Sequence, residues 1–336
     1  MPGILIAGEL ASGRLATVTA QLIAAAGKAF PGQPVSVAFC GDSLTPSGSS
    51  FTALPVSKVW LLQHTALTDG GAGGYEAPTD ALAALVKTLS PDVVLFAKTD
   101  FGANVGPRLG FRLGAAIVQD CTSVSSGVAG GAPGGLTVTR PAYGGSALAE
   151  FEMGGAGLKV IIVRPGAYEP APLEGGSPEV VDFDVYAAVR EPRVKLIGTA
   201  KEAQAGVRLE DAKTVISGGR GLGGPEPFKQ LVELAGILGG AVGASRAACD
   251  AGWIDHSHQV GLTGKTVSPR LYLAIGISGA SQHMAGCSGS GTIVAVNRDR
   301  EANIFKEARF GVVGDWQKVL PAFAATVRDL GKGQAG

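Results

Sequence analysis

A glycine-rich stretch, Ser217-Gly-Gly-Arg-Gly-Leu-Gly-Gly-Pro-Glu-Pro227, is the part of this chain whose residue types and spacing most clearly suggest chemistry. It follows an apolar run typical of a β-strand and leads into an amphipathic stretch, in which we expect Pro225 and Glu226 to begin a helix. Glycines let the backbone approach a ligand closely, and a helix N-terminus offers unpaired N–H groups to an anion. The stretch therefore predicts a nucleotide site, with an anion such as a pyrophosphate facing the helix.

Gly219, Gly221 and Gly224 also satisfy the pattern G-x-G-x-x-G of NAD-binding proteins. An NAD-binding unit places an Asp or Glu for the ribose about 20 residues further on, at the end of the next strand. Here the next apolar run ends in Gly243-Ala-Ser-Arg246, so a hydroxyl and a guanidinium stand where the acid is required. The sequence disfavours ordinary NAD binding and favours an anionic or electron-rich ligand.

Two further segments place small, hydrogen-bonding residues at the ends of apolar runs. Gln259-Val-Gly-Leu-Thr-Gly-Lys265 holds Thr263 between glycines, in a turn that offers backbone and hydroxyl hydrogen bonds. Gly276-Ile-Ser-Gly-Ala-Ser-Gln-His283 follows an expected strand and leads into an expected short helix, where its serines and glycine suit a phosphate. His283 lies in the first turn of that helix, and we expect it to contact the ligand.

Other chemistries are not indicated. The chain contains no G-x-x-x-x-G-K-[ST] phosphate loop and no G-x-S-x-G nucleophile turn. His64, His256 and His258 lack metal-ligand spacing, and the four cysteines stand apart with no C-x-x-C pair. We therefore expect no metal, and a nucleotide-like cofactor without acid–base or nucleophilic machinery.

The elements that must position these residues form two successive α/β regions. In the first, apolar runs predict strands at 3–7, 35–40, 58–63 and 93–97, with helices at 15–27, 79–89 and 104–114. This alternation is typical of a mostly parallel sheet covered by helices. From 122 to 163, short runs between glycine-rich turns predict antiparallel strands that finish the sheet as an antiparallel flank.

The second region repeats the alternation in a shorter form. Residues 165–212 are rich in proline and charge, and predict an extended connection with one strand. After it we expect strands at 214–217, 241–244, 271–275, 292–296 and 310–313, with helices at 226–238, 246–251 and 315–330. The fold class is thus α/β: an N-terminal domain at 1–190, a linker at 191–212, and a compact Rossmann-like domain at 213–336.

Composition agrees with this organisation. A chain of 336 residues is long enough for two domains. With 28 Lys plus Arg against 28 Asp plus Glu, it has no electrostatic footprint for nucleic acid. Its charged fraction of 17% suggests surface reserved for a partner. No apolar run is long enough to span a membrane, and a cytoplasmic location is expected, or the mitochondrial matrix in a eukaryote.

The motifs 217–222, 242–247, 259–265, 276–286 and 292–297 together resemble the successive FAD-binding blocks of electron-transfer flavoprotein alpha subunits. The run Gly276-Ile-Ser-Gly-Ala-Ser-Gln-His-Met-Ala-Gly286 is the most specific of them. The first half is similar to the family chiefly around Gly106-Pro-Arg-Leu109. The resemblance implies an N-terminal domain that docks to a beta subunit and a C-terminal Rossmann-like FAD domain that can swivel.

The resemblance also implies specific contacts with FAD. By similarity, Thr263 bonds the flavin N5, His283 reaches the pyrimidine O2, and Arg246 lies against the rings, which together favour an anionic reduced flavin. Asn297 and Asp315 are similar to contacts at the adenosine end. The residues implied to line the cofactor are Arg220, Gly221, Ser245, Arg246, Val260, Gly261, Leu262, Thr263, Ser278, Gly279, Ala280, Ser281, Gln282, His283, Asn297, Asp315 and Trp316.

The implied function is that of an electron carrier rather than an enzyme. Electrons would reach the FAD from a flavin dehydrogenase, such as an acyl-CoA dehydrogenase, or from NADH, and would leave to a quinone-linked or other acceptor. Leu262 departs from the family pattern, which usually has Gln, and so removes a potential hydrogen bond near the flavin. Two alternatives stay open at this point: an NAD(P)-dependent oxidoreductase, and a redox-inert adenine-nucleotide sensor.

Overall fold

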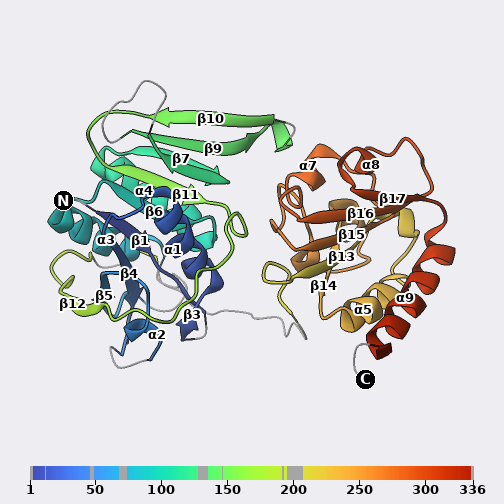
Figure 1. The fold of residues 1–336 in the computed structure, drawn as a ribbon, viewed down its shortest axis with the longest axis horizontal. Coiled ribbons are helices and arrows are strands. Elements are labelled where there is room, and N and C mark those ends of the chain that lie inside the picture. The colour runs from blue at the N-terminus through green and yellow to red at the C-terminus, as the bar shows by residue number, and fades with distance from the viewer. Residues whose placement is uncertain are drawn as a thin grey trace. The chain divides into compact units, whose positions relative to one another are not determined.

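The first sheet has seven strands in the order β12-β5-β4-β1-β6-β11-β7, as Figure 1 shows. Its neighbouring strands pair in parallel, from β12 on β5 to β11 on β7. Its strands are β1 (Ile4–Ala7), β4 (Val35–Gly41), β5 (Lys58–Gln63), β6 (Val93–Ala97), β7 (Ala116–Cys121), β11 (Lys159–Val163) and β12 (Glu179–Phe183). The four strands predicted from the first hundred residues are therefore confirmed.

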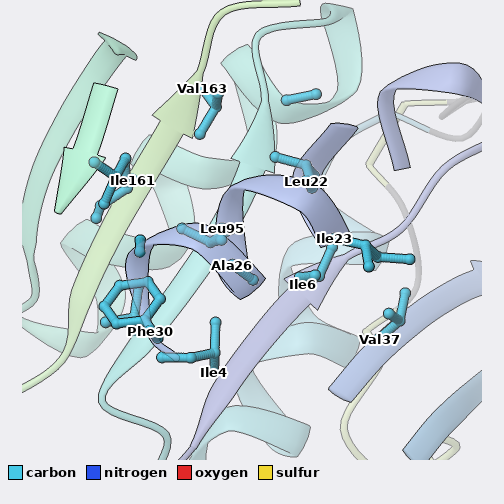
Figure 2. Close-up of a cluster of buried hydrophobic side chains, with 14 of the residues drawn as sticks. Ile4, Ile6, Leu22, Ile23, Ala26, Phe30, Val37, Leu95, Ile161 and Val163 are labelled. Carbon is cyan, nitrogen blue, oxygen red and sulfur yellow. The ribbon is translucent and has the colours of Figure 1, made fainter. Parts of the chain in front are cut away.

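Helices cover both faces of this sheet because alternate side chains of each strand point to opposite faces. Ile4 and Ile6 of β1 pack toward α1 (Thr17–Ala29), where Figure 2 shows them with Leu22 and Ala26. Leu5 instead packs on the opposite face with residues of α3 (Glu76–Leu89) and α4 (Asp100–Leu113). Because both faces of the sheet are buried, its interior strands are continuous apolar runs in the sequence.

The prediction for residues 122–163 needs a correction. The three strands β8 (Ser123–Ser126), β9 (Leu136–Ala142) and β10 (Ala147–Met153) form a separate sheet, in which β8 and β9 are antiparallel. β11 does not join them: it lies between β6 and β7 and pairs parallel to both. Its five residues are all buried, and such a strand is stable only in a sheet interior with both faces covered.

The second sheet has five parallel strands in the order β14-β13-β15-β16-β17. The strands are β13 (Thr214–Gly218), β14 (Ala241–Ala244), β15 (Leu271–Ile275), β16 (Thr292–Asn297) and β17 (Phe310–Val313). The chain runs from β13 outward to β14 and then returns to β15 on the other side. The β13/β15 junction is therefore the point where strand order reverses, and open α/β sheets bind ligands at the carboxyl ends of strands there.

The two faces of this sheet differ. One packs against α5 (Phe228–Ile237), α6 (Arg246–Asp250) and α9 (Trp316–Gly333), with Leu231, Ala248 and Leu320 in the core. The other is covered by short elements, including α7 (Ser281–Met284) and α8 (Ile304–Glu307), with Met284 and Ile304 buried. Residues of β15 alternate between the two cores, so Tyr272 faces α7 while Leu273 faces α5.

Contacts divide the chain into two units, Met1–Pro141 with Leu148–Lys201, and Ala142–Ala147 with Glu202–Gly336. The computed structural model describes residues 3–11, 13–45, 49–67, 74–127, 135–145, 147–190, 193–194 and 207–333. Most of the predicted linker, 191–192 and 195–206, lies outside these residues. In the described part of the chain, no helix is long and apolar enough to cross a membrane. The four cysteines are free.

Candidate FAD site

The predicted site residues gather at one edge of the second sheet. Most of their segments follow the carboxyl end of a parallel strand: Arg220 follows β13, Ser245 follows β14, and the 276–283 segment follows β15. The 259–265 segment reaches the same edge by pairing with the end of β14 at Ala244. Asn297 ends β16, and Asp315 comes shortly after β17. Because parallel strands place their carboxyl ends at the same edge, distant segments of the sequence meet there.

Glycines allow the loops after β13 and β15 to touch at this edge. The Gly219 and Gly221 N–H groups donate to the carbonyls of Ile275 and Gly276, both at 2.9 Å. A Cβ on Gly221 would lie 2.8 Å from the Gly276 oxygen, and Gly276 has a φ of +63°. At these positions the absence of a side chain serves contact between two loops.

The prediction of an anion site at the start of the following helix is wrong. α5 begins at Phe228, not at Glu226, and a short 3-10 turn, Arg220–Leu222, follows the strand instead. The N–H groups of Phe228 and Lys229 already donate to the carbonyls of Pro225 and Glu226, both at 3.1 Å. The two prolines in this turn have no N–H to offer.

The loop after β15 offers free donors. In the described part of the chain, the N–H groups of Ser278, Gly279, Ala280, Ser281 and Gln282 donate to no hydrogen-bond acceptor. Gly279 has a φ of +79°, and the Ser278 carbonyl accepts from Ile304 N at 3.0 Å, which ties the loop to α8. A row of unpaired backbone N–H groups suits an anionic group such as a phosphate.

The 259–265 loop is held between β14 and α7. Val260 N donates to the Ala244 carbonyl at 2.9 Å, and Leu262 N donates to the Gln282 carbonyl at 2.7 Å. Val260 itself is buried, and Gly261 has a φ of +148° with little room between it and Gln282. The Leu262 side chain is 66% exposed. The loop is therefore fixed by its backbone and exposes the side chains of Leu262 and Thr263.

Thr263 is positioned by a neighbour that the sequence analysis did not count as a site residue. Its Oγ1 accepts a hydrogen bond from Gln259 Nε2 at 3.0 Å, and Gln259 Oε1 lies 3.2 Å from His256 Nδ1. Because the threonine oxygen already accepts, its own hydrogen is free to point to a ligand. Gln259 is buried, whereas Thr263 is exposed.

His283 is the one buried histidine of this edge. Its Nε2 lies 2.9 Å from the Tyr272 hydroxyl oxygen. Burial lowers the pKa of His283 to about 4, so the ring is neutral at pH 7; the Val260 backbone acts in the opposite direction. Nδ1 is buried and has no partner with hydrogen-bond geometry in the described part of the chain. The Ser245 hydroxyl is likewise buried without a partner.

The charged predicted residues differ in how they are engaged. Arg246 is largely exposed, and its Nε lies 3.2 Å from Asp250 on the same helix. Asp315 accepts from Arg298 at 2.6 Å, and hydrogen bonds from Arg298 lower the pKa of its carboxyl. Arg220 is exposed and forms no ion pair within the described residues. All three lie at the edge, but two of them already have partners.

Two predicted residues serve structural roles. Trp316 is 6% exposed and packs in the core beneath α9 with Leu320. The Asn297 amide donates to the Ile277 carbonyl at 2.9 Å and accepts from Asp299 N at 3.0 Å, so both of its polar atoms are already bonded. The Asn297 side chain therefore has no free polar atom for a ligand.

The site also contains Tyr272, which the sequence analysis treated only as a strand residue. The available signal was chemical: a tyrosine inside an apolar strand must find a hydrogen-bond partner for its hydroxyl when buried. Nothing in the sequence pattern indicates that this partner is His283. Among the described residues, no cluster of three or more His, Cys, Asp or Glu side chains could hold a metal ion.

Comparison with known proteins identifies both regions. Residues 208–288 match the family model described as the electron transfer flavoprotein FAD-binding domain, and residues 4–188 match the electron transfer flavoprotein domain. The chain is 38% identical over 330 residues to electron transfer flavoprotein subunit alpha of Thermoanaerobacterium thermosaccharolyticum, covering 97% of this chain and 98% of that protein.

Two further relatives agree. The subunit alpha of Mycobacterium leprae is 40% identical over 324 residues, covering 96% of each chain. A protein named FixB from Clostridium saccharobutylicum is 38% identical over 255 residues, 76% of this chain and 75% of that one. The edge of the second sheet thus lies largely within the matched FAD-binding domain, and the chain belongs to the alpha-subunit family of the electron transfer flavoproteins, which carry electrons on FAD.

Proposed function

We propose that this chain is the FAD-holding subunit of a two-subunit electron carrier. A flavin dehydrogenase, such as an acyl-CoA dehydrogenase, or NADH supplies electrons, and a quinone-linked or other acceptor oxidoreductase receives them. The observation that carries the proposal is the edge of the second sheet, where free backbone donors and buried, unpaired side-chain donors lie within the FAD-binding domain of the family. The subunit contributes no bond-making residue and is a carrier rather than an enzyme.

The donor set at this edge fits FAD in chemical character. The pyrophosphate of FAD needs N–H donors, and the loop from Ser278 to Gln282 has a row of them. The flavin needs donors at its ring nitrogen and carbonyl atoms, and Thr263 and His283 supply a hydroxyl and a buried imidazole. A buried polar atom without a partner is costly unless a ligand satisfies it. Bound FAD supplies the reversible electron chemistry.

We assign the residues to parts of the cofactor as follows. Thr263 donates at the flavin N5 side, His283 at the pyrimidine carbonyl, and Arg246 lies near the ring system. Asn297 and Asp315 lie toward the adenosine, with Asn297 acting by shaping the loop because its amide is already bonded. The remaining lining positions are Arg220, Gly221, Ser245, Val260, Gly261, Leu262, Ser278, Gly279, Ala280, Ser281, Gln282 and Trp316.

The ion pair between Arg246 and Asp250 is compatible with this role. Both side chains are at least half exposed, and an exposed pair of this kind contributes only about 0.2–1 kcal/mol. A charge-assisted hydrogen bond in a partly water-excluded site is worth more, about 1.5–3 kcal/mol. The guanidinium therefore gains by exchanging Asp250 for a flavin that carries negative charge.

A beta subunit completes the protein in this proposal. The name subunit alpha, shared by most of the relatives, belongs to proteins with more than one subunit. The first unit exposes large apolar side chains, among them Phe111 at 87% and Tyr186 at 66%, which an aqueous surface does not favour. We assign residues 1–190 to docking with this partner, 191–212 to a linker, and 213–336 to FAD, and we place the complex in the cytoplasm.

Co-expression with a beta subunit tests the function. The purified complex is expected to show flavin absorbance that dithionite bleaches and air restores, whereas the chain alone is expected to lose FAD or solubility. Tight NADH binding without flavin would instead support a nicotinamide oxidoreductase. Adenine-nucleotide binding without any reducible chromophore would support a nucleotide sensor.

Arg246→Ala tests the site. It is expected to retain FAD and to lower the first reduction potential by about 60–130 mV, the electrical equivalent of the lost interaction for one electron. Lys229→Ala is the matched control, because Lys229 forms an exposed ion pair with Glu226 on the same unit at 2.7 Å. An Arg246→Ala protein with the wild-type potential would remove Arg246 from the ring system.

A further inference from the structure

The Tyr272–His283 pair is the feature that the proposed function leaves unused. Tyr272 is the second residue of β15, is fully buried, and places its hydroxyl oxygen 2.9 Å from His283 Nε2. The other polar groups beside the phenol are the Ser217 hydroxyl and the Cys287 thiol. The Cys287 thiol donates to the His283 carbonyl, at 3.7 Å. The Ser217 hydroxyl has no hydrogen-bond partner within the described residues, so the imidazole nitrogen is the acceptor that lies within hydrogen-bond distance of the phenol.

The direction of this hydrogen bond follows from the chemistry of the two groups. A phenol has one hydrogen to donate, and a buried hydroxyl that does not donate leaves that hydrogen unsatisfied. An unprotonated imidazole nitrogen is a strong acceptor, whereas a thiol sulfur is a weak one. Burial raises the pKa of Tyr272 well above its usual value, so the phenol keeps its hydrogen. Tyr272 therefore donates, and Nε2 of His283 accepts.

The hydrogen bond from Tyr272 then determines which nitrogen of the imidazole carries the proton. His283 is neutral at pH 7, because burial holds its pKa near 4. A neutral imidazole carries one N–H, and the hydrogen bond made by one nitrogen decides which nitrogen is protonated. With Nε2 accepting from Tyr272, the hydrogen lies on Nδ1, the buried nitrogen that has no partner within the described residues.

We propose that Tyr272 is a positioning residue that holds neutral His283 in the Nδ1–H form, so that the ring presents a hydrogen-bond donor to an electronegative atom of the bound cofactor. The proposal rests on the proposed function for its ligand, a flavin carbonyl. In the opposite form, Nδ1 would turn a lone pair toward the lone pairs of that carbonyl, and the contact would be repulsive. Tyr272 acts on the cofactor only through His283.

The direct test is the protonation pattern of His283 by nitrogen NMR. The alpha chain is labelled with ¹⁵N-histidine and combined with an unlabelled beta subunit, as the FAD-loaded complex and after FAD removal. The chain has only four histidines, which makes the signals assignable. We expect the wild type to show a protonated Nδ1 and an unprotonated Nε2 in both states, because Tyr272 acts without the cofactor.

Tyr272→Phe removes only the hydroxyl. We expect the FAD-free variant to shift from the single Nδ1–H form to a mixture of the two forms, and the FAD-loaded variant to have a lower first reduction potential. Tyr168→Phe is the matched control: its hydroxyl oxygen accepts a hydrogen bond from Val124 N in the first unit, so its removal deletes a phenol hydroxyl without touching His283. The control is expected to leave both measurements unchanged.

The possible outcomes distinguish the role of Tyr272 toward His283 from the role of His283 toward the flavin. A wild-type His283 with protonated Nε2 overturns the inference, and so does a Tyr272→Phe variant that keeps the pure Nδ1–H form without FAD. A variant with mixed forms but an unchanged potential supports the role of Tyr272 and removes His283 from the flavin contacts. If Tyr272→Phe does not fold, the FAD-free wild type decides: a retained Nδ1–H form supports the inference, and its loss overturns it.

Discussion

Replacing Gly219 by alanine probes the contact between the two loops at the β13/β15 junction. The added Cβ would overlap the Gly276 carbonyl oxygen and lie 2.7 Å from both the Gly276 carbonyl carbon and Ile277 Cγ1. Most of these atoms are backbone, which no side-chain rotation can move. The loops would have to separate, which would strain the hydrogen bonds from Gly219 N and Gly221 N, each 2.9 Å long.

The expected destabilisation can be worked out from these contacts. Overpacking of a tight site costs about 1–3 kcal/mol. Weakening one or two backbone hydrogen bonds adds about 0.5–1.5 kcal/mol for each. The second unit should therefore lose roughly 1.5–6 kcal/mol in Gly219→Ala. At about 1.4 kcal/mol for each factor of ten, this is a large change in the equilibrium between closed and open states.

Two glycines of the same loop provide matched controls. Gly224 has open space around its Cβ position and no positive φ, so Gly224→Ala should be neutral or slightly stabilising. Gly223 also has open space but a φ of +84°, so Gly223→Ala should cost about 1–2 kcal/mol from backbone strain alone. We therefore expect Gly224→Ala to destabilise the second unit least, Gly223→Ala more, and Gly219→Ala most.

Hydrogen exchange of the β13 and β15 amides is the suitable assay, because it reports the opening of this sheet independently of the first unit. The three variants are compared with the wild type as FAD-loaded complexes. If Gly219→Ala exchanges as slowly as Gly224→Ala, the two loops do not touch as described. If Gly223→Ala is the most destabilised variant, the loop requires glycine for its backbone conformation and not for the close approach of the two loops.

Three pH-dependent predictions concern buried or half-buried ionisable groups. Burial raises the pKa of Glu9 to about 7, so its contribution to the free energy of unfolding should fall as pH rises from about 4.5 to about 7, and Glu9→Gln should flatten this slope in urea titrations. Burial of Asp80 opposes its ionisation, but hydrogen bonds from Arg190 and Arg112 outweigh this effect and lower the pKa of the carboxyl. Asp80→Asn should therefore lower the free energy of unfolding by about 2 kcal/mol at pH 7, and this difference from the wild type should shrink below about pH 4. Because the pKa of His283 is lowered to about 4, the second unit should lose stability as pH falls from about 6.5 toward 4, and His283→Gln should show a shallower loss in hydrogen exchange.

Local pattern predicted most of the elements correctly, for a physical reason that is visible in particular strands. β5, β6, β14, β15 and β17 have the bounds expected from their apolar runs. β6 and β15 are interior strands of parallel sheets and are buried on both faces, so they produce continuous apolar runs that end at polar loops. β17 is an exposed edge strand, so burial does not explain its apolar run. The loops between them, rich in glycine and serine, lie at the carboxyl ends of these strands, where the sequence predicts a ligand site.

The pairing of strands and the first residues of helices were harder to predict from the sequence. The run at 159–163 reads as a strand, but only the tertiary fold places β11 between β6 and β7 rather than beside the antiparallel strands that precede it in sequence. The start of α5 moved from Glu226 to Phe228 because the turn between two prolines uses the N–H groups that the helix was expected to offer. Both outcomes depend on which partners the backbone finds.

By itself, the sequence determined the fold class, the strands of the second sheet and the segments that gather at its edge, because burial periodicity and turn chemistry are local properties. Tertiary structure alone decided what each side chain does there. It placed Trp316 in the core, bonded both ends of the Asn297 amide, and paired Asp315 with Arg298. It also joined Tyr272 to His283, since a hydrogen bond between a strand and a helix depends on distance in space, which no spacing in the chain encodes.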